Sequence, residues 1–278
     1  MTPLHNTTLS KDNTARQALR LIIVSTSADF DKFFNQLMTS DDPEGPHGAR
    51  IALRRIRSAL SGFSPLIDKD VLAAQKDEAR RLFRLIGTLR DADVRAESRG
   101  SARGQRSSQD ELGRIRIALR EAMITQRAAT YAERLCNLFA TRHWQRKGRK
   151  AKNWRKAPVR KIAVRALNRT WSDCRAYGPS VKDLSLPDRH SLRKDLKALR
   201  YLAEYFDNLW SGRTKDRFFR RLKSLQEQLG ILNDIAMIKE TCEPDRNAME
   251  SLEEKTAKAL AKSEKAWRLL RKRSLFWT

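Results

Sequence analysis

The chain has 278 residues, of which 58 are lysine or arginine and 33 are aspartate or glutamate, so its formal net charge at pH 7 is +25. With 11 glycines and 8 prolines it is too poor in turn-forming residues for an all-β protein, which favours a helical fold. No stretch approaches the roughly 18 consecutive apolar residues of a membrane-spanning helix, and residues 1–20 lack the apolar core of a secretion signal. The charge surplus predicts a polyanionic ligand: nucleic acid, polyphosphate or an anionic membrane surface.

Three cysteines, Cys136, Cys174 and Cys242, lie far apart, and no C-x-x-C pair occurs. An odd number of scattered cysteines argues against a disulfide framework and fits a reducing compartment. We therefore expect a cytoplasmic protein.

Apolar residues recur at helical spacing along most of the sequence, and no segment shows the alternating pattern of a β-strand. In the first half this spacing predicts four helices, at residues 14–38, 47–63, 71–97 and 109–140. A flexible loop rich in glycine and serine is predicted at 98–105. In the second half the spacing predicts four more helices, at residues 159–177, 188–210, 215–241 and 247–273.

A strongly basic segment separates the two sets of helices. Residues 141–175 hold thirteen lysines and arginines against a single acid, Asp173. We therefore expect an all-α protein with a first helical bundle at 1–140, a basic linker at 141–157 and a second bundle at 158–278.

The two halves of the chain resemble each other. A shift of 143 residues matches two segments without a gap, and the matches include two of the four histidines. The matched pairs include His47 with His190, Arg50 with Arg193, Arg57 with Arg200, Gly87 with Gly230 and Asp91 with Asp234. Arg54 meets Lys197, which keeps the charge. We interpret this as a duplication, which predicts two four-helix bundles related by a pseudo-two-fold axis.

The repeated basic residues share one side of a helix. At about 100° per residue, they fall within a stripe roughly 80° wide, separate from the apolar face of the same helix. The stripe consists of His47, Arg50, Arg54 and Arg57 in the first copy and of His190, Arg193, Lys197 and Arg200 in the second. Such a stripe suits phosphate groups, because arginine and lysine make charge-assisted hydrogen bonds to phosphate oxygens.

The alternative to a binding stripe is an ordinary solvated helix face, with the two histidines in local roles near helix starts. A solvated face usually interleaves acids with bases. No acid occurs between His47 and Ile67, and the stripe is present in both copies. These two features favour the binding interpretation.

Asp91 and Asp93 form a possible carboxylate pair for metal or acid–base chemistry. Residues two apart on a helix do not face the same way, and position 236, which matches Asp93, is alanine. We therefore expect these acids to orient nearby arginines.

The segments His47 to Leu60 and His190 to Tyr201 resemble the CHAD domain, the conserved histidine α-helical domain. The endings Leu89 to Asp93 and Leu229 to Asp234 are also similar to its pattern, and the resemblance covers about residues 14–275. It implies two four-helix bundles with a basic groove or channel between them, which bind inorganic polyphosphate without catalysis. A family relative often carries a triphosphate-cleaving domain with a Glu-x-Glu-x-Lys signature, and this sequence has no such signature.

The resemblance also implies which residues bind. It carries over the eight stripe residues and, with less support, Arg55, Arg84 and Lys223. It implies no cofactor, no metal and no catalytic residue. Association with polyphosphate or storage granules is compatible with it.

Nucleic acid is the alternative ligand. Residues 142–156 mix Trp144 and Trp154 with many cations, which suits stacking on single strands. No recognised nucleic-acid motif is visible, and a P-loop, a Gly-x-Ser-x-Gly and a His-Glu-x-x-His motif are all missing from the sequence. An enzyme is therefore not expected.

Overall fold

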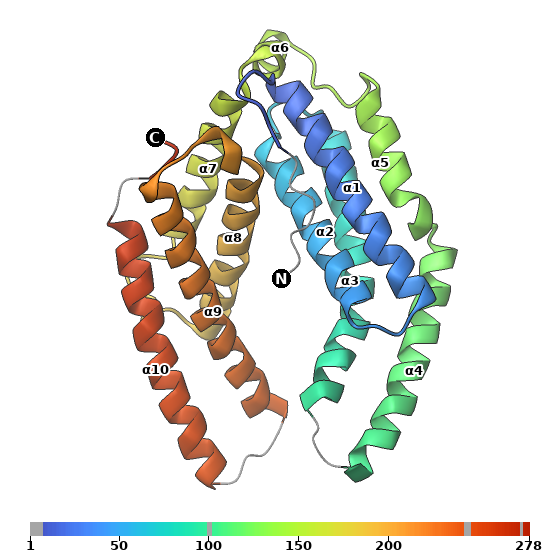
Figure 1. The fold of residues 1–278 in the computed structure, drawn as a ribbon, viewed down its shortest axis with the longest axis vertical. Coiled ribbons are helices and arrows are strands. Elements are labelled where there is room, and N and C mark those ends of the chain that lie inside the picture. The colour runs from blue at the N-terminus through green and yellow to red at the C-terminus, as the bar shows by residue number, and fades with distance from the viewer. Residues whose placement is uncertain (1–7, 99–101, 242–245, 273–274) are drawn as a thin grey trace. The chain divides into compact units, whose positions relative to one another are not determined.

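The structure is a computed structural model that describes residues 8–98, 102–241, 246–272 and 275–278 (Figure 1). These residues form ten α-helices and two 3-10 turns, with no β-strand among them, so the expected all-α class is confirmed. The chain divides into two compact units, residues 1–162 and 163–278. The helices are α1 (Ala15–Thr39), α2 (Glu44–Gly62), α3 (Lys69–Ser98), α4 (Ala102–Thr125), α5 (Tyr131–Ala140), α6 (Arg149–Lys156), α7 (Val159–Arg175), α8 (Leu186–Tyr205), α9 (Arg213–Thr241) and α10 (Arg246–Arg271).

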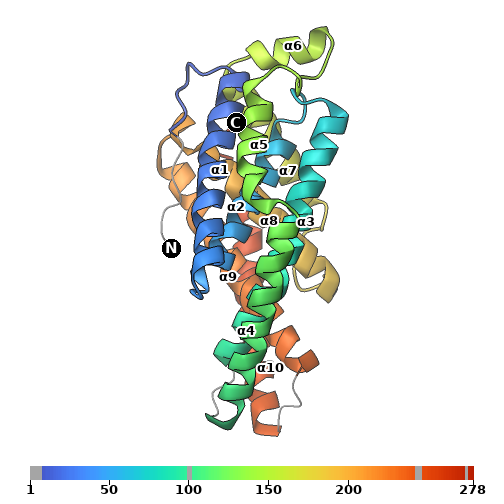
Figure 2. The same cartoon turned by 90° about the vertical axis from the view of Figure 1, so that its right-hand side faces the viewer.

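In the first unit α2 lies between α1 and α3, and α4 packs on α3. Figure 2 shows α5 following α4 and lying along α1. The N-terminus of α1 is held by a capping box, in which Thr14 accepts from the backbone of Gln17 and the Gln17 side chain accepts from the backbone of Thr14.

The prediction of a single helix at 109–140 is wrong, because the structure has two helices in this region, α4 and α5. The chain breaks at Arg127, whose φ of 50° places it in the left-handed region, and a short 3-10 turn, Ala128–Thr130, leads into α5. The new direction lets Tyr131 pack edge-on against Phe30 of α1, with ring centroids 5.5 Å apart. Left-handed backbone normally favours glycine, so the residue types around Arg127 give no signal of this break.

The segments predicted as a loop and as a linker both contain helical residues. The loop predicted at 98–105 is already helical from Ala102 onward, and residues 99–101 lie outside the described residues. The segment predicted as a linker at 141–157 contains the short helix α6.

Close packing of α2 on α1 depends on two glycines. An ideal Cβ added to Gly48 would lie 2.2 Å from the Phe33 ring, and one added to Gly45 would lie 2.7 Å from the backbone nitrogen of Leu37. The two helices therefore meet on a glycine-bearing side of α2, which leaves another side of α2 for the basic residues.

In the second unit α9 packs against α8 and against α10 (Figure 1). Trp171 of α7 and Trp267 of α10 meet with ring centroids 5.7 Å apart. The C-terminal Trp277 is buried, packs on Phe218 of α9 and donates to Asn168 Oδ1 at 2.8 Å. The end of the chain therefore closes this unit.

The two described cysteines, Cys136 and Cys174, are free, while Cys242 lies outside the described residues. Burial raises the pKa of the Cys174 thiol. Over the described part of the chain, every helix is too short or too polar to cross a membrane.

The glycine packing predicts a stability difference. Gly48→Ala is expected to lower the free energy of unfolding by about 1–3 kcal/mol, because the added methyl group displaces the buried Phe33 ring. The matched control is Gly113→Ala in α4, where nothing lies within 4 Å of the added Cβ. That change is expected to raise stability by about 0.5–1 kcal/mol. Denaturant unfolding followed by circular dichroism measures both, and equal midpoints would contradict the packing argument.

Candidate functional site

The basic stripe of the first unit lies on the side of α2 away from its core face. Leu53, Ile56 and Leu60 are fully buried, whereas His47 is exposed and the three arginines of the stripe are half-buried. The apolar contacts of α2 therefore fix the direction in which these cations point. We call His47, Arg50, Arg54 and Arg57 the α2 face.

Arg50 is held in place by α3. Its Nη1 donates to the carbonyl oxygen of Gly87 at 3.2 Å and lies 3.4 Å from Asp91 Oδ1. Its guanidinium carbon lies 4.4 Å from the centre of the Phe83 ring, and that of Arg54 lies 4.6 Å from the same ring. One aromatic ring thus stabilises two guanidinium groups through cation–π attraction.

The glycine that occurs in both halves is explained by an arginine. An ideal Cβ on Gly87 would lie 3.3 Å from Arg50 Nη1, and one on Gly230 would lie 3.3 Å from Arg193 Nη2. The same pairing of a helix glycine with an approaching guanidinium therefore occurs at matched positions of both units.

Like charges crowd the α2 face. Burial lowers the pKa of Arg57, and Arg80 and Arg54 lower it further, against a smaller opposing effect of Asp77. The Arg57 Nε is buried and makes no hydrogen bond within the described structure. Burial also lowers the pKa of Arg50, with Asp91 opposing and Arg54 adding to the shift. Both guanidiniums stay charged at neutral pH, so a bound anion would relieve this repulsion.

Helix α3 adds cations to this region. Arg84, a predicted site residue, is exposed and close enough to affect the pKa of Arg57. Arg80 acts more strongly on Arg57 and is not among the site residues predicted from the sequence. The signal that could have found Arg80 is its position four residues before Arg84 on one helix.

The matching residues of α8 form the α8 face: His190, Arg193, Lys197 and Arg200. His190 is exposed, and its Nδ1 lies 2.8 Å from Asn233 Oδ1 of α9. Arg200 Nη1 donates to Gln226 Oε1 at 3.1 Å, and its Nε lies 3.1 Å from Glu204 Oε1. The acid against the α8 face, Glu204, thus comes from α8 itself, whereas the acid against the α2 face, Asp91, comes from α3.

The acid inside the α8 segment points elsewhere. Asp195 accepts a hydrogen bond of 2.9 Å from the Tyr177 hydroxyl. Burial and the bond to Asp195 raise the pKa of Tyr177 to about 12.

The two remaining predicted site residues, Arg55 and Lys223, lie outside the α2 and α8 faces and differ in exposure. Arg55 is only 7 % exposed and lies off the α2 face, within the unit. Lys223 is well exposed on α9, and its Nζ lies 3.9 Å from Glu227 Oε1.

Asp91 and Asp93 orient arginines, as expected from the sequence. Asp91 faces Arg50, and Asp93 Oδ1 accepts from Arg116 Nη2 of α4 at 2.9 Å. Asp93 is buried, whereas the Asp91 side chain is 61 % exposed. In the part of the chain that the structure describes, no group of three or more His, Cys, Asp or Glu residues could hold a metal ion.

The basic segment 142–156 differs from its prediction at Trp144. This side chain is fully buried, with its ring 5.0 Å from that of Phe139 and its Nε1 donating to the carbonyl oxygen of Thr141 at 3.0 Å. The expectation that Trp144 stacks on bases is therefore wrong, because it belongs to the core of the first unit.

Four cations of the same segment and one of α1 line a cavity of about 300 Å³ at the start of α1. Its charged lining consists of Arg16, Arg142, Lys152, Arg155 and Lys156. Arg155 Nη1 donates to the carbonyl oxygen of Arg146 at 2.6 Å, which fixes one of these cations.

A family model described as CHAD domain matches residues 27–243. The chain belongs to the CHAD domain family. CHAD domains are known in general for polyphosphate binding and are generally non-catalytic binding domains.

Solved structures with this fold are distant in sequence. The crystal structure of the CHAD domain from the plant Ricinus communis is 20 % identical and has a TM-score of 0.74, with 98 % of this chain and 96 % of that chain covered. PptA from Streptomyces chartreusis is 16 % identical with a TM-score of 0.58, covering 93 % of this chain and 98 % of that one. These similarities establish a shared fold. No curated protein matches the chain.

Replacing either of the two aspartates of α3 is expected to lower stability, but by different amounts. Asp93→Asn is expected to lower the free energy of unfolding by about 3 kcal/mol, because it leaves the buried Arg116 without its full charge partner. Asp91→Asn is the matched control and is expected to cost less than about 1 kcal/mol, since its ion pair is exposed. Denaturant unfolding of both variants measures the difference, and a larger loss for Asp91→Asn would refute the assignment.

Proposed function

We propose that this CHAD domain binds inorganic polyphosphate without converting it, and that the α2 and α8 faces make the contacts. The observation that carries the proposal is the α2 face itself. Three half-buried guanidiniums lie on one side of α2, and no acid occurs in the sequence between His47 and Ile67.

The spacing of the α2 face suits a chain of phosphates. Successive cations are three or four residues apart, which corresponds to about 4.5–6 Å along the helix axis. That distance is similar to the span of one or two phosphates in an extended polyanion. Guanidinium groups bind phosphate oxygens through pairs of charge-assisted hydrogen bonds.

The α8 face contributes contacts of the same kind with a lower net charge. Glu204 lies against Arg200, and Glu227 lies near Lys223. We expect the α2 face to contribute more of the affinity than the α8 face. We expect Arg84 and Arg80 of α3 to extend the α2 face, and the buried Arg55 to add positive charge near it. That the two faces line one basic groove is a prediction from the sequence.

Three further points stay predictions from the sequence. They are a cytoplasmic location, association with polyphosphate or storage granules, and weaker binding of nucleic acid. The cations around the cavity beside α1 are the place where a nucleic-acid backbone would bind.

The first test is a variant that removes four cations, Arg50→Ala, Arg54→Ala, Arg193→Ala and Lys197→Ala, which we call the face variant. We expect it to remain folded and to bind long-chain polyphosphate at least about 100-fold more weakly, because it loses four charge-assisted contacts. Fluorescence anisotropy of a labelled polyphosphate measures the affinity.

The control removes the same charge from exposed sites away from both faces, with Lys11, Lys69, Lys255 and Arg268 changed to alanine. If this control weakens binding as much as the face variant does, the faces are not the site. Should the face variant fail to fold, Arg54→Gln with Lys197→Gln keeps most of each side chain's packing. That pair is expected to weaken binding about 10-fold, and unchanged affinity would reject the proposal.

Affinity should also fall steeply with salt. Each phosphate that the protein neutralises contributes about −0.7 to the slope of log K against log salt for a flexible single-stranded polyanion. The face variant should therefore have a slope shallower by about three, if its four lost cations each contacted a phosphate. An unchanged slope, measured between low and physiological salt, would show that these cations do not contact the chain.

A further inference from the structure

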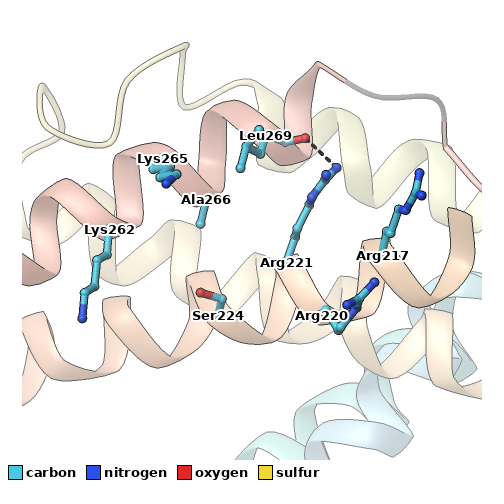
Figure 3. A pocket seen from close by; sticks show the side chains of 8 residues that line it. All are labelled: Arg217, Arg220, Arg221, Ser224, Lys262, Lys265, Ala266 and Leu269. Carbon is cyan, nitrogen blue, oxygen red and sulfur yellow. Dashed lines mark hydrogen bonds between the residues drawn. The ribbon is translucent and has the colours of Figure 1, made fainter. Parts of the chain in front are cut away.

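A second basic site lies entirely within the second unit, between α9 and α10 (Figure 3). It is a cavity of about 460 Å³. Its lining consists of Arg217, Arg220, Arg221, Ser224, Lys262, Lys265, Ala266 and Leu269. None of these residues belongs to the α8 face or was selected from the sequence.

The lining holds five cations and no carboxylate. On α10 the positions three and four residues from Lys262 and Lys265 hold no acid, so neither lysine has the usual helical ion pair. Glu264, which is next to Lys265, accepts hydrogen bonds from the backbone nitrogens of Val181 and Lys182 at 2.7 and 3.3 Å. The nearest α10 acid is therefore directed at a loop and does not neutralise the site.

One cation of the site is fixed and the floor is apolar. Arg221 Nη1 donates to the carbonyl oxygen of Leu269 at 3.2 Å, across the space between the two helices (Figure 3). Ala266 is buried and Leu269 is half-buried. The remaining four cations are exposed around this floor, so a ligand can reach them.

The first unit has acids where this site has arginines. The 143-residue shift places Arg220 on Asp77 and Arg221 on Glu78. Glu78 accepts a hydrogen bond from Arg134 of α5 and lies 3.9 Å from Arg81. A unit of this family therefore forms with acids at these two positions, so packing alone does not require arginines at the matching positions of the second unit.

We propose that the α9–α10 cavity binds a compact, multiply phosphorylated small molecule, at a site separate from the polyphosphate faces. The cavity volume is within the range of small-molecule sites, about 300–1,000 Å³. Five cations around one cavity match a ligand that carries several charges within a few ångströms, whereas an acidic peptide spreads single charges along its backbone. Guanidinium forks fit phosphate oxygens in pairs.

The test uses inorganic tripolyphosphate as the probe and isothermal titration calorimetry as the measurement. The pocket variant carries Lys262→Ala and Lys265→Ala, which leave Arg221 and the packing of α9 intact. Because the two faces would also bind tripolyphosphate, this pair of changes and the control pair are introduced into the face variant. We expect the pocket pair to weaken tripolyphosphate binding at least 10-fold relative to the face variant alone. The control, Lys255→Ala with Arg268→Ala, removes the same charge from the same helix outside the cavity lining and should stay within about twofold.

Three results would overturn the proposal. They are no binding of tripolyphosphate by the face variant, equal affinity of the face variant with and without the pocket pair, and equal binding of citrate, which has three carboxylates and no phosphate. Long-chain polyphosphate separates this proposal from the function proposed above. The pocket variant should keep most of its affinity for the long chain, and the face variant should keep tripolyphosphate binding at the cavity.

Discussion

In the first unit, the packing of α2 holds three guanidinium groups close together although their positive charges repel one another. The apolar side of α2 is fully buried against its neighbours, and Gly45 and Gly48 bring that helix close to α1. Arg50, Arg54 and Arg57 are therefore fixed along one side. Phe83 and the Gly87 carbonyl partly compensate them, yet burial and mutual repulsion still lower the pKa of Arg50 and Arg57. Under the proposed function, a polyanion on this face would compensate these charges, which would link the packing of α2 to binding.

The two units use the same framework with different compensation. Both place an arginine over a helix glycine, at Gly87 and Gly230. The ring of Phe83 stands at the position where the second unit has Gln226, which accepts a hydrogen bond from Arg200. Acids and bases are also exchanged on the third helix of each set, where Glu78 of α3 matches Arg221 of α9. The densest clusters of cations thus differ between the units: we describe one on the α2 face of the first unit and one around the α9–α10 cavity of the second.

Periodicity was sufficient to predict the helical class and the direction of the stripe, because both follow from which residues of one helix are apolar. It failed where tertiary contacts decide. Arg127 adopts a left-handed conformation at the break that precedes α5, and α5 packs along α1. No residue type near Arg127 indicates a turn. Trp144 looked like a stacking residue because its neighbours are basic, yet its ring fills the core. Phe83 and the α9–α10 cavity depend on which helices are neighbours, which a single sequence does not contain.

The most direct test of the central claim is competition at physiological salt. A labelled long-chain polyphosphate is bound to the protein, and single-stranded DNA, duplex DNA and RNA are added at equal phosphate concentration, with anisotropy as the readout. If the α2 and α8 faces preferentially bind a flexible chain of closely spaced phosphates, nucleic acids should displace the labelled polyphosphate only at large excess. Displacement by any nucleic acid at equal phosphate concentration would contradict the account and direct attention to the cations around residues 142–156.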